Sequence, residues 1–128
     1  MKNFIPILLS AVWLLTACSI KQFPQTGYTI QPVALESLMR HKQIQLIDVR
    51  TLAEYQEGHI PGAHLIDVQQ EAQFIQQIQT LDVNRPYVLY CRSGRRSKTA
   101  KDLMMQKGFK KVVDLQGGFM GWKGNTEK

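Results

Sequence analysis

The chain has 128 residues, of which 44% are hydrophobic and 20% charged, and its formal net charge is +6. This size and composition fit one small globular domain and exclude a second domain of ordinary size. The positive charge suits small anionic ligands. We expect no nucleic-acid partner, because no binding motif is present and the basic residues are scattered except at Arg92, Arg95, Arg96 and Lys98.

The N-terminal segment is organised like an export signal. Lys2 precedes an apolar stretch, residues 4–15 (FIPILLSAVWLL), that is shorter than the roughly 20 residues of a membrane-spanning helix. The alternative is an N-terminal core or amphipathic helix, but Pro6 interrupts the stretch and no polar face is present. Residues 15–18 (LTAC) resemble the bacterial lipoprotein signal, in which the cysteine after the cut receives lipid and becomes the new N-terminus.

This resemblance implies a signal peptide over residues 1–17, a lipidated Cys18 with a polar tether over 18–27, a domain over 28–124 and a polar tail over 125–128. Ser19 after the cysteine implies anchoring to the outer membrane, on the periplasmic side of the bacterial envelope. The chain without residues 1–17 keeps 15 basic and 10 acidic side chains, and Cys91 becomes its only free thiol. No intramolecular disulfide can then form, and we expect a monomer held at the membrane by lipid.

Strands and helices alternate along the domain. Thr51 and Glu54 have the spacing of a capping box, and Ser97 is the predicted N-cap of a later helix. This alternation predicts an α/β fold with a small parallel central sheet and helices on both faces. In chain order we expect a strand over residues 28–30, a helix over 32–39, a strand over 43–49, a helix over 51–57, a strand over 63–66, a helix over 69–81, a strand over 86–90, a helix over 97–107 and a strand over 111–115.

Cys91 directly follows a buried strand, at the edge where parallel sheets form their sites. Gly94 permits a turn, so the N–H groups from Arg92 to Ser97 can point inward as an anion-binding nest. Such a nest lowers the pKa of a thiol and yields the nucleophilic thiolate. The alternative is that Cys91 is a small buried hydrophobic residue and that Arg92 and Arg95 are solvated surface charges.

Four segments, taken in order, resemble the motifs of rhodanese-like sulfurtransferases. Residues 91–97 (CRSGRRS) resemble the family's active-site segment C-x-x-G-x-R-S. Residues 47–50 (IDVR), 55–63 (YQEGHIPGA) and 115–122 (LQGGFMGW) resemble three further motifs of the family. The resemblance extends over nearly all of the predicted domain and implies a rhodanese-like fold.

The resemblance also implies a reaction. Cys91 would take sulfur from a donor such as thiosulfate, hold it as a persulfide and transfer it to cyanide or to a thiol, without a metal or organic cofactor. The residues implied to shape the loop or bind the substrate are Arg92, Ser93, Gly94, Arg95, Arg96 and Ser97. His41, His59 and His64 lack the spacing of metal ligands.

Two other functions stay open. One is a persulfide carrier or a rhodanese-like module that only binds another protein. The other is a cysteine-dependent phosphatase or arsenate reductase, which needs a wider loop, C-x5-R. Here Ser97 stands where that arginine would be required, and the sequence therefore disfavours the phosphatase.

Asp48, Arg50 and His59 are expected to support the site from outside the loop. We predict that Asp48 bonds to the cysteine loop, that Arg50 pairs with Glu54, and that His59 fixes a turn through backbone contacts. Phe119 is expected to line the pocket, and residues 123–128 to be frayed.

Overall fold

The computed structural model describes residues 22–41 and 44–128, so the predicted signal peptide and Cys18 lie outside the described residues. In chain order the elements are β1 (Thr29–Ile30), α1 (Pro32–Arg40), β2 (Gln45–Asp48), α2 (Leu52–Glu57), β3 (His64–Leu65), α3 (Glu71–Ile78), β4 (Pro86–Tyr90), α4 (Arg95–Gln106), β5 (Lys111–Leu115) and α5 (Gly118–Gly121). The strands form one sheet in the order β1-β5-β4-β2-β3, and all neighbours are parallel. The predicted α/β fold is confirmed.

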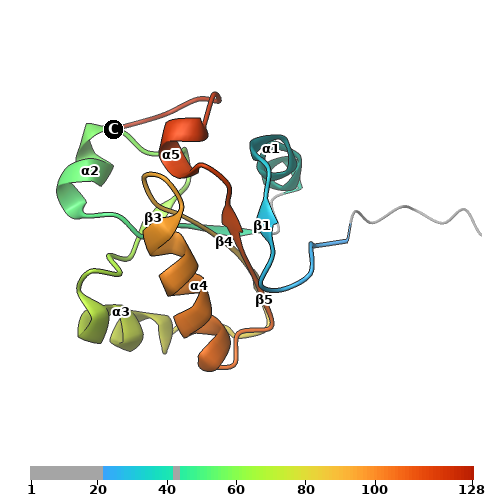
Figure 1. Cartoon of the computed structure of the whole chain (residues 1–128), viewed down its shortest axis with the longest axis vertical. Coiled ribbons are helices and arrows are strands. Elements are labelled where there is room, and N and C mark those ends of the chain that lie inside the picture. Colours follow the sequence, from blue (N-terminus) through green and yellow to red (C-terminus); the bar gives the residue numbers. More distant parts are fainter. Residues whose placement is uncertain (1–21, 42–43) are drawn as a thin grey trace, which may run out of the picture.

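Helices cover both faces of this sheet (Figure 1). Side chains of α3 and α4 share one hydrophobic cluster, whereas those of α1, α2 and α5 pack into another. Strand β4 contributes to both clusters, because successive side chains of a strand point to opposite faces. Tyr87 and Leu89 join the α3 and α4 cluster, and Val88 and Tyr90 join the other. Cys91, the next residue, falls on the α4 side.

Two element bounds differ from the prediction in an informative way. Helix α3 is shorter than residues 69–81, because a tight turn closes its end, with the Leu81 N–H donating to the Ile78 carbonyl at 3.0 Å. A helical pattern over residues 69–81 predicts Ala72 on the same buried face as Phe74 and Ile78, but Ala72 is exposed. Part of the predicted strand 43–49 lies outside the described residues, and β2 begins at Gln45.

Contacts hold part of the predicted tether, and the C-terminal residues predicted to be frayed, on the domain. Phe23 packs against the α1 cluster, and the Gly27 N–H donates to the Val112 carbonyl at 2.8 Å. At the other end, Glu127 exchanges two backbone hydrogen bonds with His59, at 2.8 and 2.9 Å. These contacts satisfy backbone groups that a free tail would leave to water. Within the described ranges, no helix is both long and apolar enough to cross a membrane.

Candidate active site

The cysteine loop connects β4 to α4 and consists of residues 91–94. Gly94 adopts the left-handed conformation, with φ 117°, and serves as the N-cap of α4. The helix therefore begins at Arg95, and the predicted start at Ser97 is wrong. Because Ser97 lies in the first turn, its side chain points inward and is fully buried.

Hydrogen-bond donors surround the sulfur of Cys91. The Gly94 N–H donates to Sγ at 3.1 Å, and the Ser97 Oγ lies 3.6 Å from Sγ. Burial raises the pKa of the Cys91 thiol. Hydrogen bonds from the Ser97 hydroxyl and from the N–H groups of Ser97, Gly94 and Ser93 together lower it by more than burial raises it, so the pKa lies below that of a free thiol. The side chain is only 1% exposed, yet these donors distinguish it from a cysteine that merely fills the core.

The backbone of helix α5 binds the backbone of the cysteine loop. The Phe119 N–H donates to the Cys91 carbonyl at 2.7 Å, and the Met120 N–H donates to the Arg92 carbonyl at 3.0 Å. Gly118 makes this approach possible, because a Cβ at this position would lie 2.5 Å from the Cys91 oxygen. From the sequence, residues 117–119 and Trp122 predict only a tight turn with aromatic anchors, and not this backbone contact. The paired glycines, Gly117 and Gly118, were the signal for a close backbone contact.

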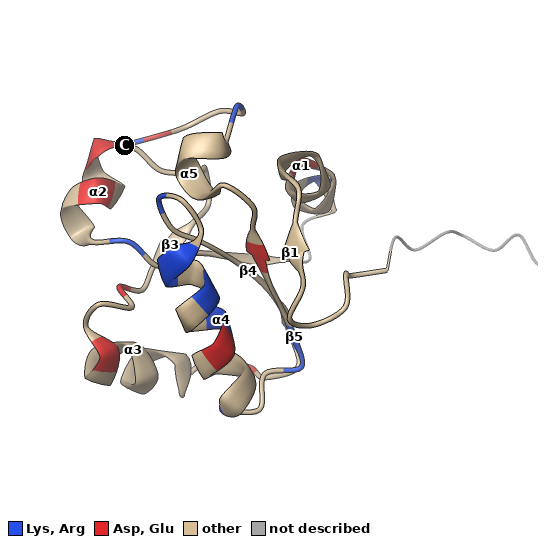
Figure 2. Cartoon of the chain, in the orientation of Figure 1, with Lys and Arg blue, Asp and Glu red and all other residues tan. Residues whose placement is uncertain are grey.

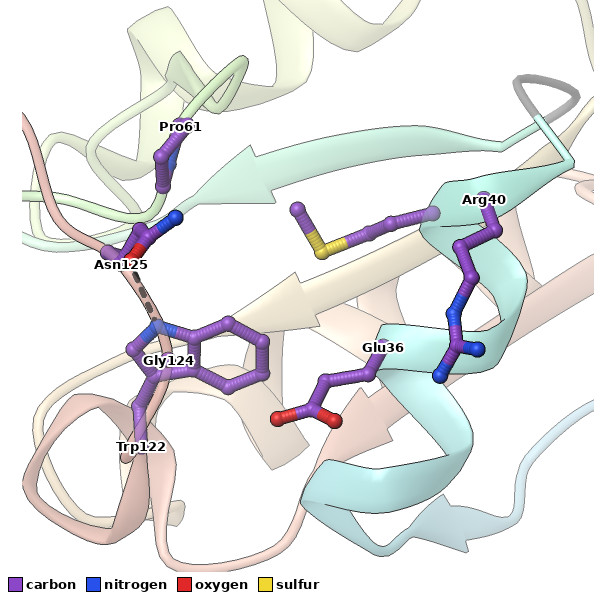
Figure 3. Close-up of a pocket in the computed structure, with 7 residues that line it drawn as sticks. Glu36, Arg40, Pro61, Trp122, Gly124 and Asn125 are labelled. Carbon is purple, nitrogen blue, oxygen red and sulfur yellow. Dashed lines mark hydrogen bonds between the residues drawn. The ribbon is translucent and has the colours of Figure 1, made fainter.

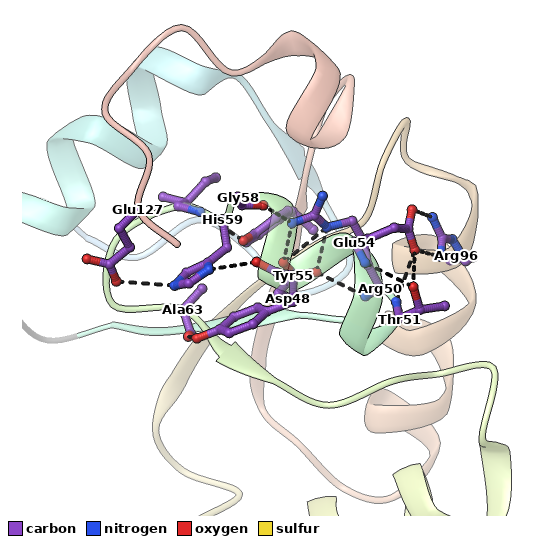
Figure 4. Close-up of polar contacts among 12 residues, drawn as sticks. Asp48, Arg50, Thr51, Glu54, Tyr55, Gly58, His59, Ala63, Arg96 and Glu127 are labelled. Atoms are coloured by element: carbon purple, nitrogen blue, oxygen red, sulfur yellow. Dashed lines mark hydrogen bonds and ion pairs between the residues drawn. The ribbon is translucent and has the colours of Figure 1, made fainter.

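Arg96 of α4 binds Glu54 of α2 (Figure 4). Both guanidinium-to-carboxylate distances are 2.8 Å. Glu54 also completes the predicted capping box with Thr51, which is confirmed. The Arg96 hydrogen bonds are the main reason that the pKa of Glu54 falls to about 2, against the opposing effect of burial. The predicted pairing of Glu54 with Arg50 is wrong, since Arg96 occupies the carboxylate.

Asp48 and Arg50 bind each other at the end of β2 (Figure 4). The shortest contact joins Arg50 Nη2 to Asp48 Oδ2 at 2.7 Å, and both side chains are buried. Arg50 also donates to the Gly58 carbonyl at 2.7 Å, and its guanidinium carbon lies 4.3 Å from the centre of the Phe119 ring. The prediction that Asp48 bonds to the cysteine loop is wrong, because Arg50 folds back over its carboxylate. The pair instead connects β2 to the elements that flank the loop.

His59 fixes the turn after α2, as predicted. Its Nδ1 lies 3.0 Å from the Tyr55 carbonyl, and its ring stacks on the Tyr55 ring at 3.7 Å between centres. Its Nε2 lies 3.3 Å from the Glu127 carboxylate (Figure 4). Tyr55 in turn donates to the Ala63 carbonyl at 2.9 Å. His59 therefore holds the C-terminal segment against α2 and does not reach the sulfur through any of these contacts.

A hollow of about 300 Å³ opens beside the cysteine loop. Arg92 and Phe119 line it together with Glu54 and Met120. Arg95 is exposed and is not among the residues that line this hollow. Basic residues follow one another through the loop and the first turns of α4 (Figure 2). The loop therefore presents positive charge beside this hollow, although Cys91 itself is not among the residues that line it.

A second hollow, of about 380 Å³, lies between α1 and the C-terminal segment. Glu36 and Arg40 approach it from α1, and Trp122 and Asn125 from the other side (Figure 3). Cys91 does not line it. In the described part of the chain, no group of three or more His, Cys, Asp and Glu side chains could hold a metal ion.

Comparison with known families agrees with this geometry. A family model described as the rhodanese-like domain matches residues 31–125. The chain belongs to the rhodanese-like family. Its solved neighbours include the rhodanese-like domain protein of Staphylococcus aureus, at 27% identity and a TM-score of 0.68 over 78% of this chain and 96% of that one. A rhodanese-related protein of Thermoplasma volcanium, at 23% identity, shares the fold with a TM-score of 0.69 over 78% of this chain and 97% of that one.

Curated members of the rhodanese-like family are similar to this chain in sequence. The thiosulfate sulfurtransferase GlpE of Shewanella oneidensis is 34% identical over 88 residues, which are 69% of this chain and 84% of GlpE. A sulfurtransferase of Allochromatium vinosum is 36% identical over 86 residues, 63% of this chain and 73% of that protein. YrkF of Bacillus subtilis, which has the words sulfur carrier protein in its name, is 32% identical over 107 residues, 80% of this chain and only 56% of YrkF.

One buried ion pair near the rhodanese-like loop was not expected from the sequence. Lys101 of α4 and Asp114 of β5 meet with a distance of 2.7 Å between Nζ and Oδ1. The Asp114 Oδ2 lies 3.4 Å from the hydroxyl of Ser97, which itself contacts the cysteine. A lysine on an inward face of a helix and an aspartate inside an apolar strand were the only signals in the sequence.

Proposed function

We propose that this protein is a sulfurtransferase in which Cys91 takes a sulfane sulfur from a small anionic donor such as thiosulfate and passes it to cyanide or to a thiol. The observation that carries this proposal is the environment of the Cys91 sulfur. A backbone N–H donates to it at 3.1 Å and a buried hydroxyl lies 3.6 Å away, at the carboxyl end of a central strand. Such donors stabilise anionic sulfur, both as thiolate and as persulfide.

The reaction divides into two balanced displacements. In the first, the Cys91 thiolate attacks the outer sulfur of thiosulfate, the sulfur–sulfur bond of the donor breaks, and sulfite leaves with the bonding electron pair. In the second, cyanide or a thiolate attacks the outer sulfur of the persulfide, and Cys91 leaves as the thiolate. The free enzyme is regenerated without any added oxidant or reductant.

The positions of the arginines support sulfur transfer over phosphate chemistry. Arg92 is exposed beside the hollow and is available to attract the sulfonate end of a donor, and Arg95 adds charge nearby. Arg96 is bound to Glu54 through two hydrogen bonds. A phosphatase needs an unengaged guanidinium at the end of its loop, and here the next position is the buried Ser97.

A carrier function is the second candidate, since the relative YrkF has sulfur carrier protein in its name. A carrier would complete the first displacement and then release sulfur only to a protein partner. A sulfurtransferase therefore turns over with small acceptors such as cyanide, whereas a carrier does not.

Steady-state kinetics distinguish them. We expect turnover with thiosulfate and cyanide, with parallel lines in double-reciprocal plots, because the first product leaves before the acceptor binds. Thiosulfate, mercaptopyruvate and a small persulfide should be compared as donors. Cys91→Ser should show no turnover with any of them. Intersecting lines, or turnover in the serine variant, would contradict the proposed reaction, and uptake of sulfur without turnover on small acceptors would identify a carrier.

We also propose that the protein is a monomer anchored by lipid on Cys18, on the periplasmic side of the outer membrane. The order of Lys2, the apolar residues 4–15 and the segment LTAC supports this location.

A further inference from the structure

Lys101 and Asp114 form an ion pair that the proposed reaction does not use. Their side chains are only 5% and 4% exposed, and Nζ lies 2.7 Å from Oδ1. Thr29 of β1 donates to the same oxygen at 2.8 Å. Burying two opposite charges costs solvation free energy that their attraction seldom exceeds, so such a pair is weak evidence for a purely stabilising role.

The pair is connected to the reacting sulfur through a single hydroxyl. Ser97 Oγ lies 3.4 Å from Asp114 Oδ2 and 3.6 Å from Cys91 Sγ, so the carboxylate oxygen is at most about 7 Å from the sulfur. The Gly94 carbonyl is a third neighbour of this hydroxyl, at 3.1 Å. A serine hydroxyl has one hydrogen, and these three acceptors compete for it.

The competition depends on charge. When Cys91 is a thiol, its hydrogen can point to the Ser97 oxygen. When Cys91 is a thiolate, it needs the Ser97 hydrogen. An aspartate without a cation would attract that hydrogen strongly, because hydrogen bonds to ionised acceptors are the stronger ones.

We propose that Lys101 and Asp114 are positioning residues for Cys91: the ammonium group neutralises the carboxylate, so that only the Gly94 carbonyl competes with the sulfur for the Ser97 hydrogen and no uncompensated negative charge lies beside the thiolate. The inference rests on the proposed function only in taking the thiolate of Cys91 as the reacting form. It assigns a part in the reaction to two residues outside the cysteine loop.

The other ionisable groups around the sulfur do not share this connection. They come from the loop, from the end of β2, from α2, from the turn before α3 and from the first turn of α4. Each is paired with another side chain or is exposed, except the half-buried Asp67, which accepts a hydrogen bond from the Gln69 N–H at 2.8 Å. These groups are Arg92 and Arg95, the pair of Asp48 with Arg50, the pair of Glu54 with Arg96, and Asp67.

The test is the pH dependence of Cys91 alkylation in the full-length chain. The neutral reagent iodoacetamide reports the thiolate fraction without any sulfur donor. Lys101→Met leaves a negative charge and should raise the pKa of Cys91, whereas Asp114→Asn leaves a positive charge and should lower it. A unit charge about 7 Å away at an effective dielectric constant of about 20 shifts a pKa by roughly 1 to 2 units.

The double variant Lys101→Met/Asp114→Asn should return the pKa of Cys91 to within about half a unit of the unmodified value, because the two charge changes cancel. Lys98→Met and Asp102→Asn are the matched controls, since this pair lies on the same helix at 3.1 Å but is exposed. Solvent screening should hold their effect to about 0.3 units or less.

Opposite shifts in the two single variants support the inference. An unchanged pKa in both, or shifts of the same sign, would show that the pair is only structural and would overturn it. If Lys101→Met does not fold, a pKa of Cys91 that is not lowered in Asp114→Asn overturns the inference. If the unmodified protein shows no sulfur transfer, the proposed function is refuted, but the result of this alkylation test is not affected.

Discussion

The position of the cysteine loop depends on residue 118 being a glycine. Its φ is +55°, in the left-handed region, and a Cβ there would lie 2.5 Å from the Cys91 oxygen and 2.7 Å from the Arg92 carbonyl atoms. Both neighbours are backbone atoms, which cannot rotate away. Any side chain at residue 118 must therefore displace either the loop or α5.

Gly118→Ala should disrupt the site as well as the fold. We expect a loss of about 1–3 kcal/mol in the free energy of unfolding from the overpacking, and a loss of roughly 100-fold in sulfur transfer from the displaced sulfur. Chemical denaturation and turnover with thiosulfate measure the two effects. Gly108→Ala is the control, because its φ is +91° but nothing lies within 4 Å of the added Cβ. Equal losses of activity in both variants would contradict the explanation.

The sequence identified Cys91 and Gly94 because residue type and spacing are sufficient to recognise such a loop. It could not identify the partners of the charged residues. Arg96 and Glu54 are 42 positions apart, and only the packing of α4 beside α2 brings them together. Asp114 reaches the site because the parallel register aligns it with Leu89 of β4. Contacts of this kind depend on tertiary structure, which local patterns do not contain.

At the scale of elements, the ion pair of Glu54 with Arg96 holds α2 against the first turn of α4. The carboxylate is partly buried and accepts two hydrogen bonds from the guanidinium. The pKa of Glu54 is lowered from 4.5 to about 2, chiefly by these bonds. A carboxylate with a lowered pKa in the folded state stabilises the fold above its unfolded pKa, and this contribution disappears as the pH falls through the folded pKa.

Glu54→Gln should therefore destabilise the protein in a pH-dependent way. At pH 7 we expect the free energy of unfolding to fall by about 1–3 kcal/mol, and the difference from the unmodified protein should shrink between about pH 5 and pH 2. Urea unfolding at several pH values measures it. The exposed Glu57 on the same helix offers the same charge change as a control. A difference that stays constant down to pH 2 would show that the ion pair is not its source.

The bounds of the elements were predictable where a short run of apolar residues marks them, as for β4 and β5. The start of α4 was missed by two residues, because Ser97 is a common capping residue and the alternative cap is a glycine. Its hydroxyl faces the sulfur instead. A serine can cap a helix or can point from its first turn into the protein. Gly94, in its left-handed conformation, caps α4 and thereby places Ser97 inside the first turn.

At the scale of the whole molecule, the two described ends limit how the domain can be attached. Phe23 and Gly27 are packed on the domain, so at most residues 18–22 of the predicted tether can extend away from it. A chain from Cys18 to Phe23 spans at most about 18 Å when fully extended. If Cys18 carries lipid, the domain works close to the membrane surface.

Cys18→Ser tests the anchor. We expect the unmodified protein to incorporate a labelled fatty acid and to sediment with membranes, and the variant to lose the label, since serine offers no thiol for the lipid. Metabolic labelling followed by mass spectrometry of the N-terminal peptide measures it. Label retained on the variant would refute lipidation at this position.

The most direct test of the central claim is the intact mass of the protein after incubation with thiosulfate and removal of the excess donor. A persulfide on Cys91 predicts a gain of one sulfur atom, about 32 Da, that disappears on addition of cyanide and is absent in Cys91→Ser. No gain of mass with thiosulfate, mercaptopyruvate or a small persulfide, or the same gain in the serine variant, would contradict the account.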